Sequence, residues 1–335
     1  MKNYKTIIGI DVSKLKLDVS FVQDTHVKHH HHFIVINDEK GIKQIIKELK
    51  KMKIEPTDCL FCFENTGIYS MPLSFYLSKM KVDYWVVPAL EIKRSKGISR
   101  GKTDKTDSQD IAFYALTHIH KLQLTALPEK EILKLKLLFT EREKLMKVIK
   151  MLDTTRENDI FLPKEIVKEV LSANRKTVTF LRKALKEIEQ KMITIIKENA
   201  VMQKQFELAC SVPGVGPQTA TYLIITTKSF TAFSNWRKLA CYSGIAPFEY
   251  SSGSSIKGRT RVNDLADKKM KSMLNMCALN SKRIDAELNQ YYSRKIDEGK
   301  NSMSVMNAIR CKVLSRVFAT VNRGTPYVDV KKFIN

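Results

Sequence analysis

Four carboxylate residues occupy positions that predict a divalent-metal site. Asp104 and Asp107 lie three residues apart in the stretch Lys102–Asp107, so they share one face if a helix begins there. Asp11 and Glu64 each end an apolar segment that is typical of a buried strand. Mg²⁺ prefers oxygen ligands and usually keeps several waters, so a few carboxylates and a substrate phosphate complete its coordination. These residues therefore predict a site for Mg²⁺, or for Mn²⁺, that acts on a phosphodiester.

Each acid taken alone also has a simpler explanation. Asp104 and Asp107 would favour the N-terminus of a helix, where the helix dipole attracts negative charge, and Glu64 could be a solvated strand end. An isolated D-x-x-D is weak evidence. All four acids in this order on these elements are stronger evidence, because their repulsion at one site would need a cation to offset it.

The composition favours a polyanion as the partner. The chain of 335 residues has 58 Lys and Arg against 35 Asp and Glu, a formal net charge of +23. Lys and Arg neutralise phosphates, and solubility alone seldom needs so large an excess. The excess is largest in residues 206–335, where we expect most of the phosphate-binding surface. With no apolar run of membrane-spanning length and no signal pattern, we expect a cytoplasmic protein that does not enter a membrane.

Hydrophobic periodicity predicts the elements that must position the acids. Strands are expected at residues 4–12, 15–22, 30–36, 59–64 and 84–87, and helices at 38–53, 70–80 and from 104 to about 118. This order is typical of an α/β ribonuclease H-like (RuvC-like) domain, which we assign to residues 1–125. In that fold Asp11 and Glu64 would end neighbouring strands, and the helix that begins near Asp104 would bring its two acids to the same edge.

The rest of the chain predicts helices. Two long amphipathic helices, at 129–157 and 163–200, predict a helical hairpin or coiled coil over residues 126–205 that serves as a spacer or an oligomerisation arm. Residues 206–335 predict an all-α C-terminal domain. Its Gly214 and Gly216 are typical of a helix-hairpin-helix turn that points backbone N–H groups at a phosphate, although an ordinary turn between packed helices has the same composition.

A Ser-rich stretch in the C-terminal domain holds a second candidate for chemistry. A serine hydroxyl in Tyr250–Ser255 could attack a phosphodiester and conserve the bond energy as a phosphoserine ester, although most such stretches are linkers or caps. Lys257, Arg259 and Arg261 follow at alternate positions, so on a strand they would line one face and bind phosphate. From these residues alone the nucleophilic role stays open.

Six short motifs resemble, in this order, the DEDD-type insertion-sequence transposases, now described as bridge-RNA-guided recombinases, a family that includes the Piv-type DNA invertases. The motifs are G-I-D-V-S-K, F-E-N-T-G, K-T-D-K-T-D-S-Q-D, V-P-G-V-G, Y-S-G-I-A-P and Y-S-S-G, and they cover nearly the whole chain. The resemblance implies a four-acid metal site formed by Asp11, Glu64, Asp104 and Asp107. It also implies that Ser252 is the nucleophile of the C-terminal domain, with the adjacent Ser251 as the alternative.

The resemblance also implies partners. Members of this family assemble an active site from the acids of one subunit and the serine of another, which implies a homodimer or a homotetramer. A structured guide RNA would select both donor and target DNA by base pairing. The protein itself would then read little sequence, which agrees with a basic chain that has no recognition-helix motif.

One segment departs from the family pattern. Many members carry a Lys-x-Gly-Asn-x-x-Leu-Arg-like segment after the serine, and the matching residues 264–271 have Ala266 and Lys271 in place of the Gly and the Arg. The ammonium group of lysine then replaces a planar guanidinium group that could form two hydrogen bonds to one phosphate, so the phosphate contacts differ. The second half of the segment stays basic, and we count Lys268 and Lys271, together with Lys102 before the predicted helix, among the nucleic-acid-binding candidates.

The sequence thus predicts a DNA transposase or recombinase that cleaves, exchanges and rejoins strands through a serine–DNA intermediate. Two alternatives stay open. A hydrolytic nuclease of the junction-resolving type would need the acids and the metal, but no serine. A nucleic-acid-binding protein without catalysis would tolerate amides in place of the acids, because its binding depends on the basic surface.

Overall fold

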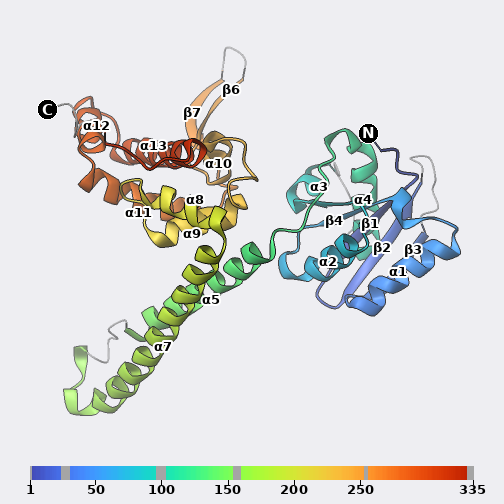
Figure 1. The fold of residues 1–335 in the computed structure, drawn as a ribbon, viewed down its shortest axis with the longest axis horizontal. Coiled ribbons are helices and arrows are strands. Elements are labelled where there is room, and N and C mark those ends of the chain that lie inside the picture. Colours follow the sequence, from blue (N-terminus) through green and yellow to red (C-terminus); the bar gives the residue numbers. More distant parts are fainter. Residues whose placement is uncertain (1, 24–30, 96–102, 154–159, 253–255, 330–335) are drawn as a thin grey trace. The chain divides into compact units, whose positions relative to one another are not determined.

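The computed structural model describes residues 2–23, 31–95, 103–153, 160–252 and 256–329, without the side chains of residues 250–257, 259 and 260. The chain folds into two compact units, Met1–Leu127 and Pro128–Asn335 (Figure 1). The first unit holds the predicted acids. The second holds both the two long helices and the C-terminal helices.

A five-stranded mixed sheet forms the centre of the first unit, in the order β3-β2-β1-β4-β5. Its strands are β1 (Thr6–Val12), β2 (Lys16–Val22), β3 (His31–Ile36), β4 (Cys59–Glu64) and β5 (Tyr84–Val87). β2 pairs antiparallel with β1 and β3, whereas β4 pairs parallel with β1 and β5. This mixed α/β architecture is consistent with the predicted ribonuclease H-like fold.

Helices cover both faces of the sheet. They are α1 (Glu39–Lys51), α2 (Met71–Lys79), α3 (Ala89–Ser95) and α4 (Asp104–Thr117). Alternate strand residues point to opposite faces, so Ile8 and Ile10 pack in one core with residues of α1 and α2. Ile7 packs in the other core, with Ile111 of α4. Asp11 is therefore on the face of the sheet that α4 covers.

The second unit begins with the helical arm, formed by α5 (Lys130–Asp153) and α7 (Lys164–Glu198). The two helices are antiparallel: Arg142 of α5 pairs with Glu189 of α7, whereas Asp153, further along α5, pairs with Arg182, which comes earlier in α7. Pro163 precedes α7 as its N-cap residue, which agrees with the predicted break. At the base of the arm, residues from the start of α5 and the end of α7 share a core with α9.

The C-terminal helices pack around one long central helix, α13 (Ser302–Arg323). They are α8 (Ala200–Cys210), α9 (Pro217–Thr227), α10 (Trp236–Tyr242), α11 (Lys268–Ile284), α12 (Ala286–Asp297) and α13 (Ser302–Arg323). Ile309, Val313 and Val317 of α13 are fully buried in their core. Among the described residues, no helix is long and apolar enough to cross a membrane.

The prediction of an all-α C-terminal domain was wrong in one place. An antiparallel hairpin, β6 (Pro247–Ser252) and β7 (Ile256–Val262), stands between α10 and α11 (Figure 1). Strand prediction depends on alternating apolar residues, and this polar, basic stretch has few of them. The structure does contain a strand, β7, at Lys257, Arg259 and Arg261, the residues whose alternate spacing would place them on one strand face.

Candidate metal-carboxylate site

Close packing at Gly9 presses α4 against β1. A Cβ atom at Gly9 would lie 2.2 Å from the Ser108 carbonyl oxygen and 2.4 Å from the Ala112 nitrogen, so only glycine allows this approach. The hydroxyl oxygens of Ser20 and Ser108 are 2.7 Å apart and join α4 to β2 as well. The first turn of α4 consequently lies beside the end of β1, where Asp11 is.

A capping box determines where α4 begins. The Thr103 hydroxyl accepts a hydrogen bond from the Thr106 backbone N–H, and the Thr106 hydroxyl accepts one from the Thr103 N–H. These bonds satisfy two helix donors and make Asp104 the first helical residue, as predicted. Asp107 follows one turn later, and both carboxylates also interact favourably with the positive end of the helix dipole.

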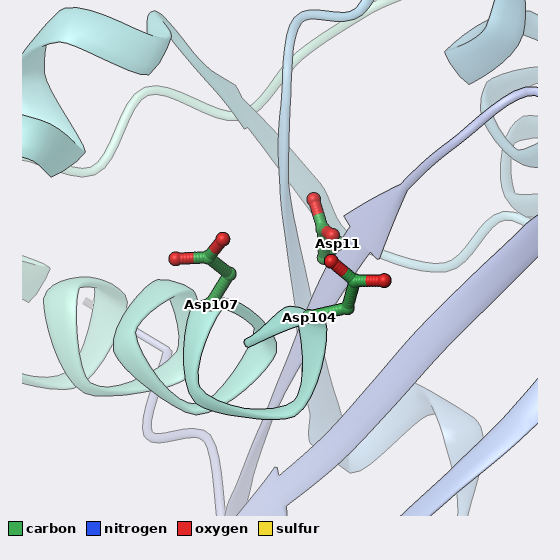
Figure 2. Close-up of side chains that lie close together, drawn as sticks. All are labelled: Asp11, Asp104 and Asp107. Carbon is green, nitrogen blue, oxygen red and sulfur yellow. The ribbon is translucent and has the colours of Figure 1, made fainter. Parts of the chain in front are cut away.

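Asp11, Asp104 and Asp107 converge at this place. One carboxylate oxygen from each residue lies within 4.8 Å of those from the other two. Figure 2 shows Asp11 at the end of β1, beside the first turn of the helix that carries the other two acids. Asp11 and Asp107 are partly buried, and Asp104 is exposed. The structure thus brings together three of the four predicted acids from segments more than ninety residues apart in sequence.

Glu64 lies beside this cluster, but its carboxylate is not among the three whose oxygen atoms lie within 4.8 Å of one another. The β1–β4 ladder pairs Ile10 with Phe63, so Asp11 and Glu64 follow at neighbouring strand ends, as predicted. Glu64 is close enough for its negative charge to contribute to the raised pKa of Asp11.

Burial and neighbouring acids raise the pKa of Asp11 to about 6. Burial is the largest cause, because it disfavours the charged form, and the negative charges of Asp107, Asp104, Glu64 and Asp18 follow. The donor set fits a divalent cation: it is made of oxygen atoms, three of them converge, and their repulsion is the kind that a cation relieves. The cluster therefore has the chemistry of a divalent-cation site.

Two charged residues that the sequence did not single out border the cluster. Asp18 pairs with Asp11 across the β1–β2 ladder, and only 2% of its surface is exposed. Lys16 Nζ lies 2.7 Å from Asp104 Oδ2 and 3.1 Å from Asp18 Oδ2. The sequence signal that could have identified them is the alternation of Lys16, Asp18 and Ser20 along β2, because it places all three on the face of the sheet that Asp11 occupies.

The predicted serine nucleophile lies at the end of β6. In the β6–β7 ladder Ser252 pairs with Ile256, and the neighbouring Ser251 pairs with Lys257. The structure therefore places both serines next to the connection between the two strands. Residues of the predicted site that fall outside the description are Lys102 and the side chains of Ser251, Ser252, Lys257 and Arg259.

The basic candidates that are described lie on β7 and in the first turn of α11. Arg261 on β7 and Lys268 at the start of α11 are exposed. Lys271, one turn further along α11, is partly buried. Arg261 and Lys268 are accordingly the described basic candidates that solvent, and hence a phosphate group, can reach most easily.

The turn between α8 and α9 uses its two glycines differently. Gly214 has a φ of +89°, and a Cβ atom there would lie 2.2 Å from Ser281 Oγ and 2.6 Å from the Cys277 carbonyl oxygen, so it packs against α11. The Ser281 hydroxyl also donates a 2.6 Å hydrogen bond to the Pro213 carbonyl. Gly216 is the N-cap residue of α9 with no side-chain cap, and a Cβ atom there would meet nothing within 4 Å. Gly216 is the glycine with open space around it.

Comparison with known proteins identifies the class of enzyme. Residues 8–155 match a transposase family, the DEDD transposases of IS110 type, and residues 206–293 match the transposase IS116/IS110/IS902 family. The pilin gene-inverting proteins of Moraxella bovis and Moraxella lacunata are each 24% identical over 328 residues, 96% of this chain and 98% of theirs. An uncharacterized 43.6 kDa protein of insertion element IS110 from Streptomyces coelicolor is 32% identical over 117 residues, 35% of this chain and 29% of that protein.

These matches place the chain among DNA recombination enzymes, as predicted. More specifically, its N-terminal part is similar to the DEDD transposases of IS110 type, a later part is similar to the IS116/IS110/IS902 transposases, and pilin gene-inverting proteins are among its relatives. The DEDD domain, together with the acidic cluster, indicates the use of a divalent metal.

Proposed function

We propose that this chain is a Mg²⁺-dependent transposase or recombinase that cleaves, exchanges and rejoins DNA strands. The convergence of Asp11, Asp104 and Asp107 beside the sheet carries this proposal, in a chain that matches transposase families at both ends. With Glu64 the acids follow the order D, E, D, D, which corresponds to the name of the matched domain. We assign the RuvC-like form of the ribonuclease H-like fold to residues 1–125.

Asp11, Glu64, Asp104 and Asp107 are the residues that would hold the ion. When bound, a divalent ion neutralises charge on the phosphoryl group and orients the scissile phosphate. The protein contributes a rigid frame for the acids, because Gly9 lets α4 rest on β1 and the capping box sets the first turn of α4. The ionised form of Asp11 is the one that binds a cation, whereas burial and the neighbouring carboxylates favour its protonated form.

Ser252 is the proposed nucleophile, with Ser251 as the alternative. Its hydroxyl oxygen attacks the scissile phosphorus, and a bond between serine and phosphate forms as the bond to the leaving deoxyribose oxygen breaks. The serine loses its proton, and the leaving oxygen gains one. Attack by a DNA hydroxyl on the phosphoserine ester reverses these changes and rejoins the strands. Lys257, Arg259 and Arg261 follow on β7 and would stabilise the phosphoryl charge.

The acids lie in the first compact unit and the serine in the second, and we propose that the acids of one subunit act together with the serine of another. We therefore propose a homodimer or homotetramer in which the helical arm, residues 126–205, provides contacts between subunits. Phe161 and Phe180 of the arm are 80% and 70% exposed, and Ile160, Ile166 and Val170 are at least half exposed, a gathering of apolar side chains that is typical of an interaction site. A structured guide RNA and donor and target DNA complete the proposed partners, and the net charge of +23 suits them.

A search for a covalent protein–DNA adduct tests this function. Full-length protein with its co-purified RNA would be incubated with Mg²⁺ and DNA labelled at the 5′ or the 3′ end, and resolved on a denaturing gel. We expect an adduct in the wild type that disappears in Ser252→Ala and in Asp11→Ala. Its loss in Ser251→Ala alone would move the nucleophile by one residue. Cleavage without any adduct would favour the hydrolytic nuclease instead.

A further inference from the structure

Lys16 bridges the carboxylate cluster and a buried acid next to it. Its ammonium nitrogen lies 2.7 Å from Asp104 Oδ2 and 3.1 Å from Asp18 Oδ2. A lysine side chain carries its positive charge throughout the neutral range. Lys16 therefore supplies a cation to one of the acids that a divalent ion would contact.

Asp18 anchors this cation from the buried side. Asp18 is 2% exposed, and its Oδ1 lies 3.2 Å from His32 Nε2. Its Oδ2 makes no hydrogen bond of good geometry within the described part of the chain, and Lys16 is its ion-pair partner. A charge buried this deeply needs a compensating partner. Asp18 and Lys16 share one face of β2, so the strand itself keeps the ammonium group beside the cluster.

We infer that Lys16 is a positioning residue that neutralises Asp104 until a divalent ion enters the cluster, and then shifts toward Asp18. This inference rests on the proposed metal site. In the metal-free protein the ammonium group offsets the repulsion among Asp104, Asp107 and Asp11. When the ion binds, the same group competes for Asp104 and must move, and Asp18 is the acceptor toward which it moves.

The role has two measurable consequences. A neutral side chain at position 16 removes the competitor, so the cluster binds a divalent ion more tightly. The same change removes one cation from beside the acids, so the metal-free protein becomes less stable to heat. An ordinary surface ion pair, which contributes little to stability and competes with no ligand, would change neither property appreciably.

Calorimetric titration of full-length, EDTA-treated protein with Mn²⁺ at pH 7.5 tests the inference. The variants are Lys16→Met, Lys16→Arg and, as the matched control, Lys14→Met, which removes the same charge from an exposed residue just before β2. We expect Lys16→Met to bind Mn²⁺ about tenfold more tightly than the wild type, as the loss of one adjacent charge implies. Lys16→Arg and Lys14→Met should stay within about twofold of the wild type.

Thermal unfolding provides the second measurement. In EDTA we expect a lower Tm for Lys16→Met than for Lys14→Met, and Mn²⁺ should raise the Tm of Lys16→Met by more than it raises that of the wild type. Both differences follow from the loss of the internal cation and do not require DNA or RNA.

The outcomes separate this inference from the metal site itself. If Lys16→Met and the wild type bind Mn²⁺ equally, and Asp107→Asn abolishes binding in both backgrounds, the metal site stands and the role of Lys16 is overturned. An equal gain of affinity in Lys14→Met would also overturn it, since general charge would then explain the effect. No Mn²⁺ binding by the wild type or by Lys16→Met would overturn the metal site and the inference together.

Discussion

Gly9 and Ala112 bring the backbones of β1 and α4 into contact, since a Cβ atom at Gly9 would lie 2.4 Å from the Ala112 nitrogen. Asp11 lies two residues further along the strand, and Asp107 lies just over one turn earlier on the helix. The distance between these two acids therefore depends on how closely the strand and the helix approach at Gly9.

Gly9→Ala should damage the fold and the metal site together. The added methyl group meets backbone atoms that cannot move away as a side chain could, so α4 must shift, and such overpacking costs about 1–3 kcal/mol. We expect a lower urea midpoint and at least tenfold weaker Mn²⁺ binding. Gly216→Ser is the control for stability, because a Cβ atom at Gly216 meets nothing within 4 Å and Ser is a favourable N-cap residue. Unchanged Mn²⁺ binding in Gly9→Ala would show that this contact does not set the geometry of the acids.

Asp11→Asn should stabilise the metal-free protein while it removes metal binding. The pKa of Asp11 is raised from 3.8 to about 6, so the folded state binds more protons than the unfolded state between these values. The free energy of unfolding then falls as the pH rises from about 4 to about 6, and above that range the ionisation of Asp11 lowers it no further. With EDTA present we expect Asp11→Asn to have the higher Tm at pH 7.5 and a similar Tm near pH 4. If the Tm of Asp11→Asn exceeded that of the wild type by the same amount at both pH values, the raised pKa of Asp11 would not be the cause.

Much of the frame around the acids could be predicted from the sequence. The strands Cys59–Glu64 and Tyr84–Val87 have the predicted bounds, because apolar runs that end at a polar residue or a proline mark a buried strand clearly. The start of α4 was also predictable, since Thr and Asp favour a helix N-terminus.

The remaining features depend on contacts between distant segments. Lys16 and Asp104 are 88 residues apart, and nothing local to either one indicates that they form an ion pair. Gly9 occurs within an ordinary apolar strand, and its importance becomes evident only when α4 packs on it. The β6–β7 hairpin has few apolar residues, so the pattern that marks a half-buried strand is weak there.

Gly216→Asp should separate folding from nucleic-acid binding at the turn before α9. Asp and Asn are both good N-cap residues, and replacing a glycine there changes stability by only a few tenths of a kcal/mol. Asp, however, adds a negative charge where a phosphate would approach. We expect Gly216→Asp to bind duplex DNA about tenfold more weakly than Gly216→Asn in fluorescence anisotropy at low salt, with the two Tm values close together. Equal DNA affinities would show that this turn does not contact phosphate.

Phe180→Ser should weaken the self-association that we propose for the helical arm. Phe180 is 70% exposed on α7, so in a monomer its replacement would remove few contacts and leave the Tm almost unchanged. If a second copy of the chain covers it, the loss of the buried ring costs about 1.5–3 kcal/mol of association free energy for each copy. Sedimentation equilibrium over a range of concentrations would then show a smaller average mass. Lys183→Ser, an exposed change less than one turn away, is the matched control and should associate like the wild type. If Phe180→Ser also associates like the wild type, this part of α7 lies outside the subunit interface.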